Sequence, residues 1–295
     1  MRPAEPIDYP MTRELAGKRV RRLGLGSTRL TADAPASAEH AEGSRIVERA
    51  GELGVTVIVT DPSSDGAGIE KLVFDSLGPR RHDVVVISQL PRLADGPYMS
   101  VDAWRDDLRR HVDHRLTRLG VDALNVLQLD AQQSPLRLVD QVEALSALLD
   151  EHLVYAIGLR ETDVKGLEEA VSIAPIATVQ NQLSLTDRRH EDLVDACDRL
   201  DVAFVACSAL DGGRLTAPGG RPVDRPVDDI AWRTGSMYSH LALGWLLRRS
   251  PAIVVAPSTG NKQHLEENME TPDMSLDPSD FAVLSRLVRP GTRSD

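Results

Sequence analysis

Acidic side chains stand at the ends of several β-branched runs, where they could handle protons. Four such residues follow these runs: Asp61, Asp65, Asp130 and Glu161. If the runs are parallel strands, their carboxyl ends meet at one face of the fold. Carboxylates that lose solvent there can act as general acids or bases. Asp130 is the strongest single candidate because it directly ends a predicted strand, whereas Asp61 and Asp65 occupy a loop.

Structural alternatives stand beside this acid–base interpretation. Asp130 could form an ion pair with Arg160, and Asp61 and Asp65 could simply shape a turn. A carboxylate metal site is disfavoured, since no histidine accompanies these residues and their spacing follows no metal-loop signature. Cys207 also ends a predicted strand, but no histidine is placed to activate it, which favours a buried, unreactive thiol.

The elements that would position these residues follow one repeating plan. Eight short strands are predicted at Leu23–Gly26, Val55–Val59, Val84–Ser88, Ala123–Leu129, Ala156–Leu159, Thr178–Asn181, Ala203–Cys207 and Ile253–Ala256. Helical spacing of apolar residues lies between them, as in Ile46–Leu53, Trp104–Leu119, Val139–Leu153, Leu193–Leu200 and His240–Leu247. Eight alternating units predict an α/β fold, a single-domain (β/α)₈ TIM barrel over residues 1–295. Chemistry in such a barrel belongs at the carboxyl ends of the strands.

Three segments have no place in this repeat. The segment Arg2–Arg22 would precede the barrel. Gly66–Gly68 is expected to be a flexible loop leading into a helix at Ile69. Asp211–Asp229, the longest irregular stretch, is either a lid over the site or a connection without function.

Composition narrows the possible partners. The chain has 295 residues and a formal net charge of −11, which disfavours binding to nucleic acid or to an anionic membrane. Two cysteines cannot form a disulfide framework, and no apolar run approaches the roughly 18 residues needed to span a bilayer. No secretion signal is evident. We expect a cytoplasmic protein with a small-molecule substrate; the sequence does not specify its oligomeric state.

Several passages in order along the chain resemble the aldo-keto reductase family. Arg22–Ser27 looks like the first strand of that family, Val179–Gln182 like the sixth and Phe204–Leu210 like the seventh. The most specific passage is Pro257–Asn268, which resembles the nucleotide-phosphate loop and the helix after it. The resemblance implies a barrel that reduces carbonyls with NADPH, using an Asp, a Tyr, a Lys and a His to protonate the developing alkoxide.

The four catalytic positions that the resemblance implies carry other residues. They fall on Val59, Ser64, Leu90 and Asp130, and a small shift would bring Asp61 to the first position. We therefore expect a divergent member that lacks the tetrad.

The resemblance leaves the adenine end of the cofactor site better preserved than the nicotinamide end. Arg160 and Glu161 replace a Ser-Asn pair, and Cys207 replaces a Tyr that stacks on the ring. Backbone N–H groups after Pro257 could hold a phosphate. The residues expected to contact NADP(H) are Gly26, Ser27, Gln180, Ser208, Leu210, Ser258, Thr259, Gly260, His264, Glu267 and Asn268.

Three functions remain open at this point. The first is a repurposed enzyme performing elimination, cyclisation or isomerisation, with Asp130, Glu161 and Asp61 as proton-handling groups. The second is a non-catalytic protein that retains NADP(H). The third is an atypical NADPH-dependent carbonyl oxidoreductase, in which Asp130 or an ordered water supplies the proton.

Overall fold

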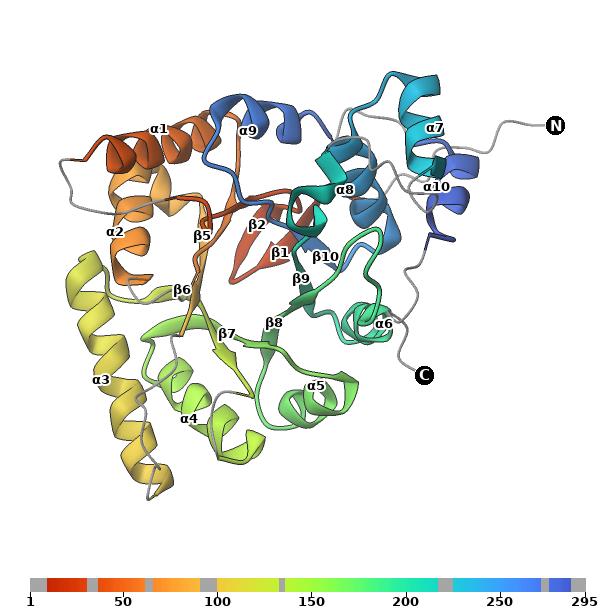
Figure 1. Cartoon of the computed structure of the whole chain (residues 1–295). Coiled ribbons are helices and arrows are strands. Elements are labelled where there is room, and N and C mark those ends of the chain that lie inside the picture. Colours follow the sequence, from red (N-terminus) through yellow and green to blue (C-terminus); the bar gives the residue numbers. More distant parts are fainter. Residues whose placement is uncertain are drawn as a thin grey trace.

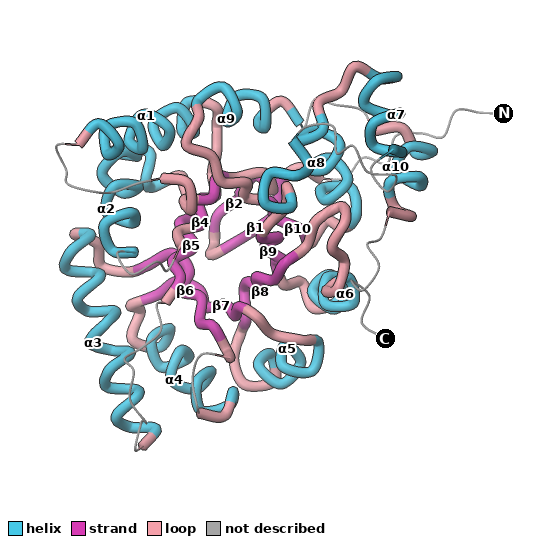
Figure 2. Tube along the Cα trace, in the orientation of Figure 1, coloured by secondary structure: helices cyan, strands magenta, loops and turns pink. Residues whose placement is uncertain are grey.

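The structure is a computed structural model, which describes residues 10–30, 37–61, 66–90, 100–132, 136–216, 225–271 and 276–287. Within these ranges the predicted barrel is confirmed. Its parallel strands surround a central axis and its helices form an outer ring (Figures 1 and 2).

Eight parallel strands form the barrel wall. They are β3 (Leu25–Gly26), β4 (Val57–Val59), β5 (Val85–Gln89), β6 (Leu124–Asp130), β7 (Val154–Arg160), β8 (Ile176–Gln182), β9 (Ala203–Cys207) and β10 (Ile253–Val255). They pair in chain order from β3 to β10. Two parallel bridges, Leu23 to Val255 and Gly26 to Ser258, join the first strand to the last and close the barrel.

Helices follow most of the strands. Their bounds are α1 (Ala38–Glu52), α2 (Gly66–Leu77), α3 (Val101–Leu119), α4 (Leu138–Asp150), α5 (Val164–Val171), α6 (Glu191–Arg199), α7 (Arg225–Thr234), α8 (Tyr238–Arg249), α9 (Lys262–Met269) and α10 (Pro278–Leu284), with 3₁₀ turns η1 (Gly78–His82) and η2 (Asp211–Thr216). Two predicted loops need correction. Gly66–Gly68 forms the first turn of α2, and the segment Asp211–Asp229 contains η2 and the start of α7.

Helix α3 shows how local sequence sets these elements. Ser100 caps its first turn by accepting a hydrogen bond from the Ala103 backbone N–H, and Gly120 ends it with a left-handed φ of 65°. Its buried side chains recur at helical spacing, so that one face packs on the barrel while the other stays in water.

The bottom of the barrel is sealed by residues before the first barrel strand. The predicted N-terminal segment forms an antiparallel hairpin, β1 (Thr12–Leu15) and β2 (Lys18–Arg21). Leu15 and Val20 of this hairpin pack into the same apolar cluster as the inward-facing strand residues. The amino end of the barrel is therefore closed, which leaves the carboxyl end for ligands.

Arg22 ties this hairpin to the closing strand. Its side chain is fully buried and donates hydrogen bonds to the backbone carbonyls of Pro10, Leu247, Ser250 and Ile253. A guanidinium satisfied by fixed carbonyls holds several chain segments together.

Candidate functional site

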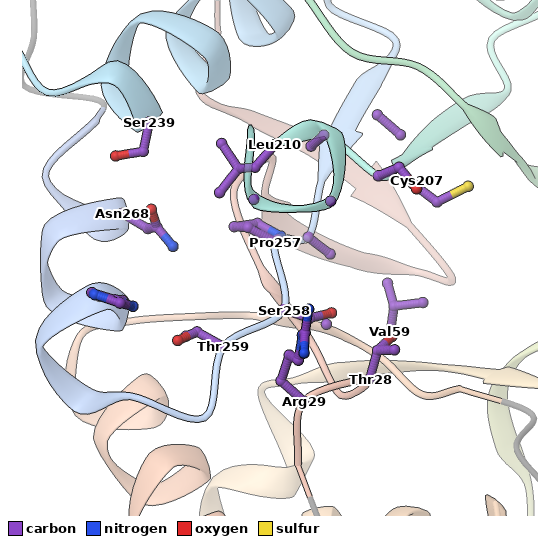
Figure 3. Close-up of a pocket in the computed structure, with 18 of the residues that line it drawn as sticks. Thr28, Arg29, Val59, Cys207, Leu210, Ser239, Pro257, Ser258, Thr259 and Asn268 are labelled. Carbon is purple, nitrogen blue, oxygen red and sulfur yellow. The ribbon is translucent and has the colours of Figure 1, made fainter. Parts of the chain in front are cut away.

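A cavity of about 970 Å³ opens at the carboxyl ends of the barrel strands (Figure 3). Its wall includes the ends of β3, β4, β5, β7, β8, β9 and β10, together with η2, the start of α8 and one side of α9. Ten of the eleven residues predicted to contact a cofactor line it: Gly26, Gln180, Ser208, Leu210, Ser258, Thr259, Gly260, His264, Glu267 and Asn268. The eleventh, Ser27, is buried behind the wall, where its Oγ accepts a hydrogen bond from the Asp61 backbone N–H at 3.0 Å.

The loop after β10 is held tightly against the first strand. The Gly26 backbone N–H donates to the Pro257 carbonyl at 3.1 Å. A Cβ added at Gly26 would lie 2.3 Å from Ser258 Oγ and 2.6 Å from the Ala256 carbonyl oxygen, so only glycine fits here. This contact places Ser258 and Thr259 on the cavity wall.

The N-terminus of α9 is already capped by the protein itself. The Asn261 side chain accepts hydrogen bonds from the backbone N–H groups of Gln263 and His264. The predicted phosphate cradle therefore depends on the loop before the helix and on side chains, more than on free amides of the first turn. His264 is exposed, whereas Asn268 is buried at the cavity wall.

Two features of this wall were not predicted as site residues. Arg29 follows β3, is exposed and lines the cavity next to Ser258 (Figure 3). Gly212 and Gly213 of η2 also line it, with φ values of 66° and 93°, and no atom lies within 4 Å of where their side chains would begin. The Gly-Gly pair in the sequence could have predicted this turn, because glycine readily adopts positive φ.

The inner end of the cavity lies between β4, β5 and β8. Val59 lines it, as predicted. The expectation for Leu90 is wrong: this residue packs in the outer apolar layer, and Gln89 lines the cavity instead. Successive residues of a strand face opposite sides, so the predicted placement on β5 was off by one residue. Gln89 Nε2 donates to Gln180 Oε1 at 2.9 Å. Ser64 lies outside the described residues.

Cys207 lines the cavity at the end of β9 (Figure 3). Burial, together with the negative charge of Glu161, raises the pKa of this thiol to about 12. The thiolate is therefore scarce at neutral pH, in agreement with the predicted unreactive cysteine.

Of the three predicted catalytic carboxylates, only Asp61 lines the cavity. Its Oδ2 accepts a hydrogen bond from Thr28 Oγ1 at 3.2 Å. Asp130 and Glu161 are not among the described residues of the wall. Asp130 Oδ1 instead accepts a hydrogen bond from the Gln132 backbone N–H at 3.1 Å. Asp65 lies outside the described residues.

The predicted ion pair between Asp130 and Arg160 is not formed in the described part of the chain. Their Cα atoms are partners across β6 and β7, but no salt bridge joins the side chains within 4.0 Å. Within the same ranges no cluster of three or more His, Cys, Asp or Glu residues could hold a metal ion. No described helix is both long and apolar enough to cross a membrane.

The chain is similar in sequence to a known protein family and to several relatives. The model of the aldo/keto reductase family matches residues 22–289. An uncharacterised oxidoreductase of Schizosaccharomyces pombe is 28% identical over 274 residues, covering 90% of this chain and 86% of the relative. Pyridoxine 4-dehydrogenase of Escherichia coli is 26% identical over 285 residues, covering 93% and 97%.

Solved structures agree on the fold. A thermostable aldo-keto reductase in complex with the inhibitor epalrestat superposes with a TM-score of 0.80 and is 26% identical, covering 94% of this chain and 99% of that one. An aldo/keto reductase from Klebsiella pneumoniae, solved with NADP and acetate, has a TM-score of 0.78 and is 22% identical, covering 97% and 98%.

Proposed function

The chain belongs to the aldo/keto reductase family, and we propose that it binds NADP(H) beside a small-molecule substrate in the barrel cavity, with Asp61 as its acid–base group. The observation that carries this proposal is the cavity itself. It brings ten predicted cofactor contacts from β3, β8, the turn after β9, the β10 loop and α9 into one wall. Residues so distant in sequence would not line one space by helical or strand periodicity alone.

The residues present fit a dinucleotide. Ser258, Thr259 and the exposed Arg29 offer hydroxyls and a positive charge to phosphates, and the open turn at Gly212 and Gly213 leaves backbone accessible on the opposite wall. His264, Glu267 and Asn268 lie on α9 for the adenosine end. Bound at this site, NADP(H) would supply or accept a hydride.

Among the described residues predicted to handle protons, Asp61 is the one that lines this space. The Asp61 backbone N–H donates a hydrogen bond to the Ser27 hydroxyl, and its Oδ2 accepts one from the Thr28 hydroxyl. These two bonds hold the carboxylate in position beyond the end of β4. A carboxylate held in place can take a proton from, or return one to, a substrate at the inner end of the cavity. Elimination, isomerisation and cyclisation all need such a group.

A second candidate function is a protein that binds NADP(H) without turnover. It is favoured by Val59 and Gln89, which line the inner end where an acid and an amine would be needed for carbonyl reduction by the usual route. Neither side chain exchanges a proton near neutral pH.

The first experiment is a fluorescence titration of the protein with NADPH and NADH. We expect saturable NADPH binding at micromolar concentrations. In a Ser258→Tyr variant, the larger side chain would not fit beside Gly26, against which Ser258 packs directly. This variant should therefore bind NADPH more weakly. Absence of binding at millimolar NADPH would overturn the cofactor assignment.

The second experiment separates the functions. A panel of aldehydes, ketones and hydroxylated small molecules is incubated with protein and NADP(H), and products are followed by mass spectrometry and by absorbance at the NADPH band. Asp61→Asn should reduce turnover at least tenfold, with Asp130→Asn and Glu161→Gln as matched controls outside the wall. NADPH binding without any product favours the second candidate, and Asp61-dependent NADPH consumption identifies an atypical oxidoreductase.

A further inference from the structure

Arg160 places a positive charge inside the barrel mouth. It is the last residue of β7, where its Cα is the register partner of Asp130 on β6 and Gln180 on β8. Ala156, four residues earlier, packs in the inner cluster of the barrel. Side chains alternate along a strand, so Arg160 also faces inward, and it lines the cavity.

The space below the Arg160 side chain, at the glycine two residues before it, is already occupied. A Cβ at Gly158 would lie 2.0 Å from Thr178 Oγ1, in a space already filled by the hydrogen bond from Gln128 Nε2 to that hydroxyl. The layer below Arg160 is therefore closed and polar. The arginine side chain stands above it, in the floor of the cavity.

No partner for the Arg160 guanidinium is found among the described residues. It donates none of the side-chain hydrogen bonds recorded there and joins none of the salt bridges, and its Nε is buried without a hydrogen-bond partner. Asp130, its register partner, is engaged by the Gln132 backbone N–H instead. Arg160 is thus a cation at the cavity wall that no described residue pairs.

An unpaired cation at a partly buried position is costly to fold, because it gives up water without gaining a counter-charge. An anionic ligand would offset that cost. Two amide side chains line the same inner end. Gln89 donates a hydrogen bond to Gln180, which holds both side chains in place, and Gln180 is the register partner of Arg160. The inner end therefore combines one fixed cation with oriented polar groups.

We propose that Arg160 anchors the carboxylate of the substrate, so that this protein acts on small carboxylic acids. This inference rests on the proposed function, in that the substrate would lie beside the nicotinamide end of NADP(H), the end at which the family resemblance places Arg160 and Gln180. A guanidinium matches a carboxylate with two parallel N–H···O bonds, which would fix the orientation of the rest of the molecule relative to Asp61.

A carboxylate suits this position better than a phosphate does. One guanidinium carries one positive charge, which balances a carboxylate, whereas a phosphate near neutral pH carries more negative charge than Arg160 alone can neutralise. The other arginine among the described residues of the wall, Arg29, follows β3 and lies next to Ser258 (Figure 3). Strands β3 and β7 stand on opposite sides of the barrel.

The test is calorimetric titration of the intact protein, with and without NADPH, using acetate and pyruvate against acetamide and pyruvamide, and inorganic phosphate as a further probe. We expect the wild type to bind the carboxylates saturably and to bind the amides at least tenfold more weakly. Arg160→Gln should lose at least tenfold in carboxylate affinity, about 1.4 kcal/mol, and Arg160→Lys should fall between the two. Arg137→Gln, which changes an arginine with a 78% exposed side chain, is the matched control.

The variant is expected to fold. Removing an uncompensated cation should leave the melting temperature of Arg160→Gln equal to or above that of the wild type. Equal carboxylate affinities of wild type and Arg160→Gln would overturn the inference, as would tighter binding of phosphate than of carboxylates. So would an Arg160→Gln variant that loses NADPH and keeps carboxylates, because the arginine would then serve the cofactor. Failure of NADPH to bind the wild type, with Arg160-dependent carboxylate binding intact, would count against the proposed function alone.

Discussion

Gln89, at the end of β5, donates a 2.9 Å hydrogen bond to the side chain of Gln180, at the end of β8. Strands β6 and β7 stand between them in the sheet, so this bond spans the barrel mouth rather than joining neighbouring strands. Both residues are nearly buried and both line the cavity. The bond sets the inner boundary of the proposed substrate pocket.

Replacing either glutamine by leucine should destabilise the protein by about 1–2 kcal/mol, because the remaining amide loses its buried partner. The double variant should lose less than the sum of the single variants, since no amide is then left unpaired. Urea unfolding of all four proteins measures this coupling. Strict additivity would mean that the two amides are independently hydrated.

Arg29→Ala should weaken NADPH binding about tenfold, because an exposed guanidinium beside the β10 loop attracts cofactor phosphates. The difference should shrink as salt rises, since screening weakens exposed charges. Fluorescence titration at two salt concentrations provides the measurement. Arg45→Ala, which removes an exposed arginine paired with Glu42 on α1, is the control and should bind NADPH as the wild type does.

Neither cysteine should react readily with a thiol reagent in the folded protein. Burial raises the pKa of both Cys197 and Cys207 to about 12. At pH 8 the reactive thiolate is therefore scarce, and its fraction should rise only as the pH approaches that value. A colorimetric thiol assay should find slow reaction when native and rapid reaction of both residues in denaturant. Rapid reaction of one native thiol at pH 7, blocked by NADPH, would contradict this expectation.

Arg22→Lys should lower the free energy of unfolding by at least about 2 kcal/mol. A lysine cannot reproduce the forked geometry with which Arg22 reaches carbonyls from several segments, so buried acceptors would lose their donors. Guanidinium chloride unfolding gives the value. Arg19→Lys, at an exposed strand position, should change stability by less than about 0.5 kcal/mol. Equal effects of the two substitutions would show that the carbonyls are satisfied in another way.

The sequence by itself determined the fold. β-branched runs and helical spacing alternate regularly enough to specify eight units, and every predicted strand overlaps an observed one. Periodicity reports which residues are buried, and burial is what forms the elements. The Pro257–Asn268 passage was also interpretable locally, because its residues act within one loop and one helix.

Only the tertiary structure decided which side chains meet. A shift of one residue turns a side chain to the other face of a strand, and this is why Gln89 rather than Leu90 reaches the cavity. Asp61, two residues after β4, lines the cavity, whereas Asp130, the last residue of β6, does not. The unpaired state of Arg160 depends on the side-chain directions of its neighbours across the barrel, which are fixed by packing in three dimensions and not by sequence spacing.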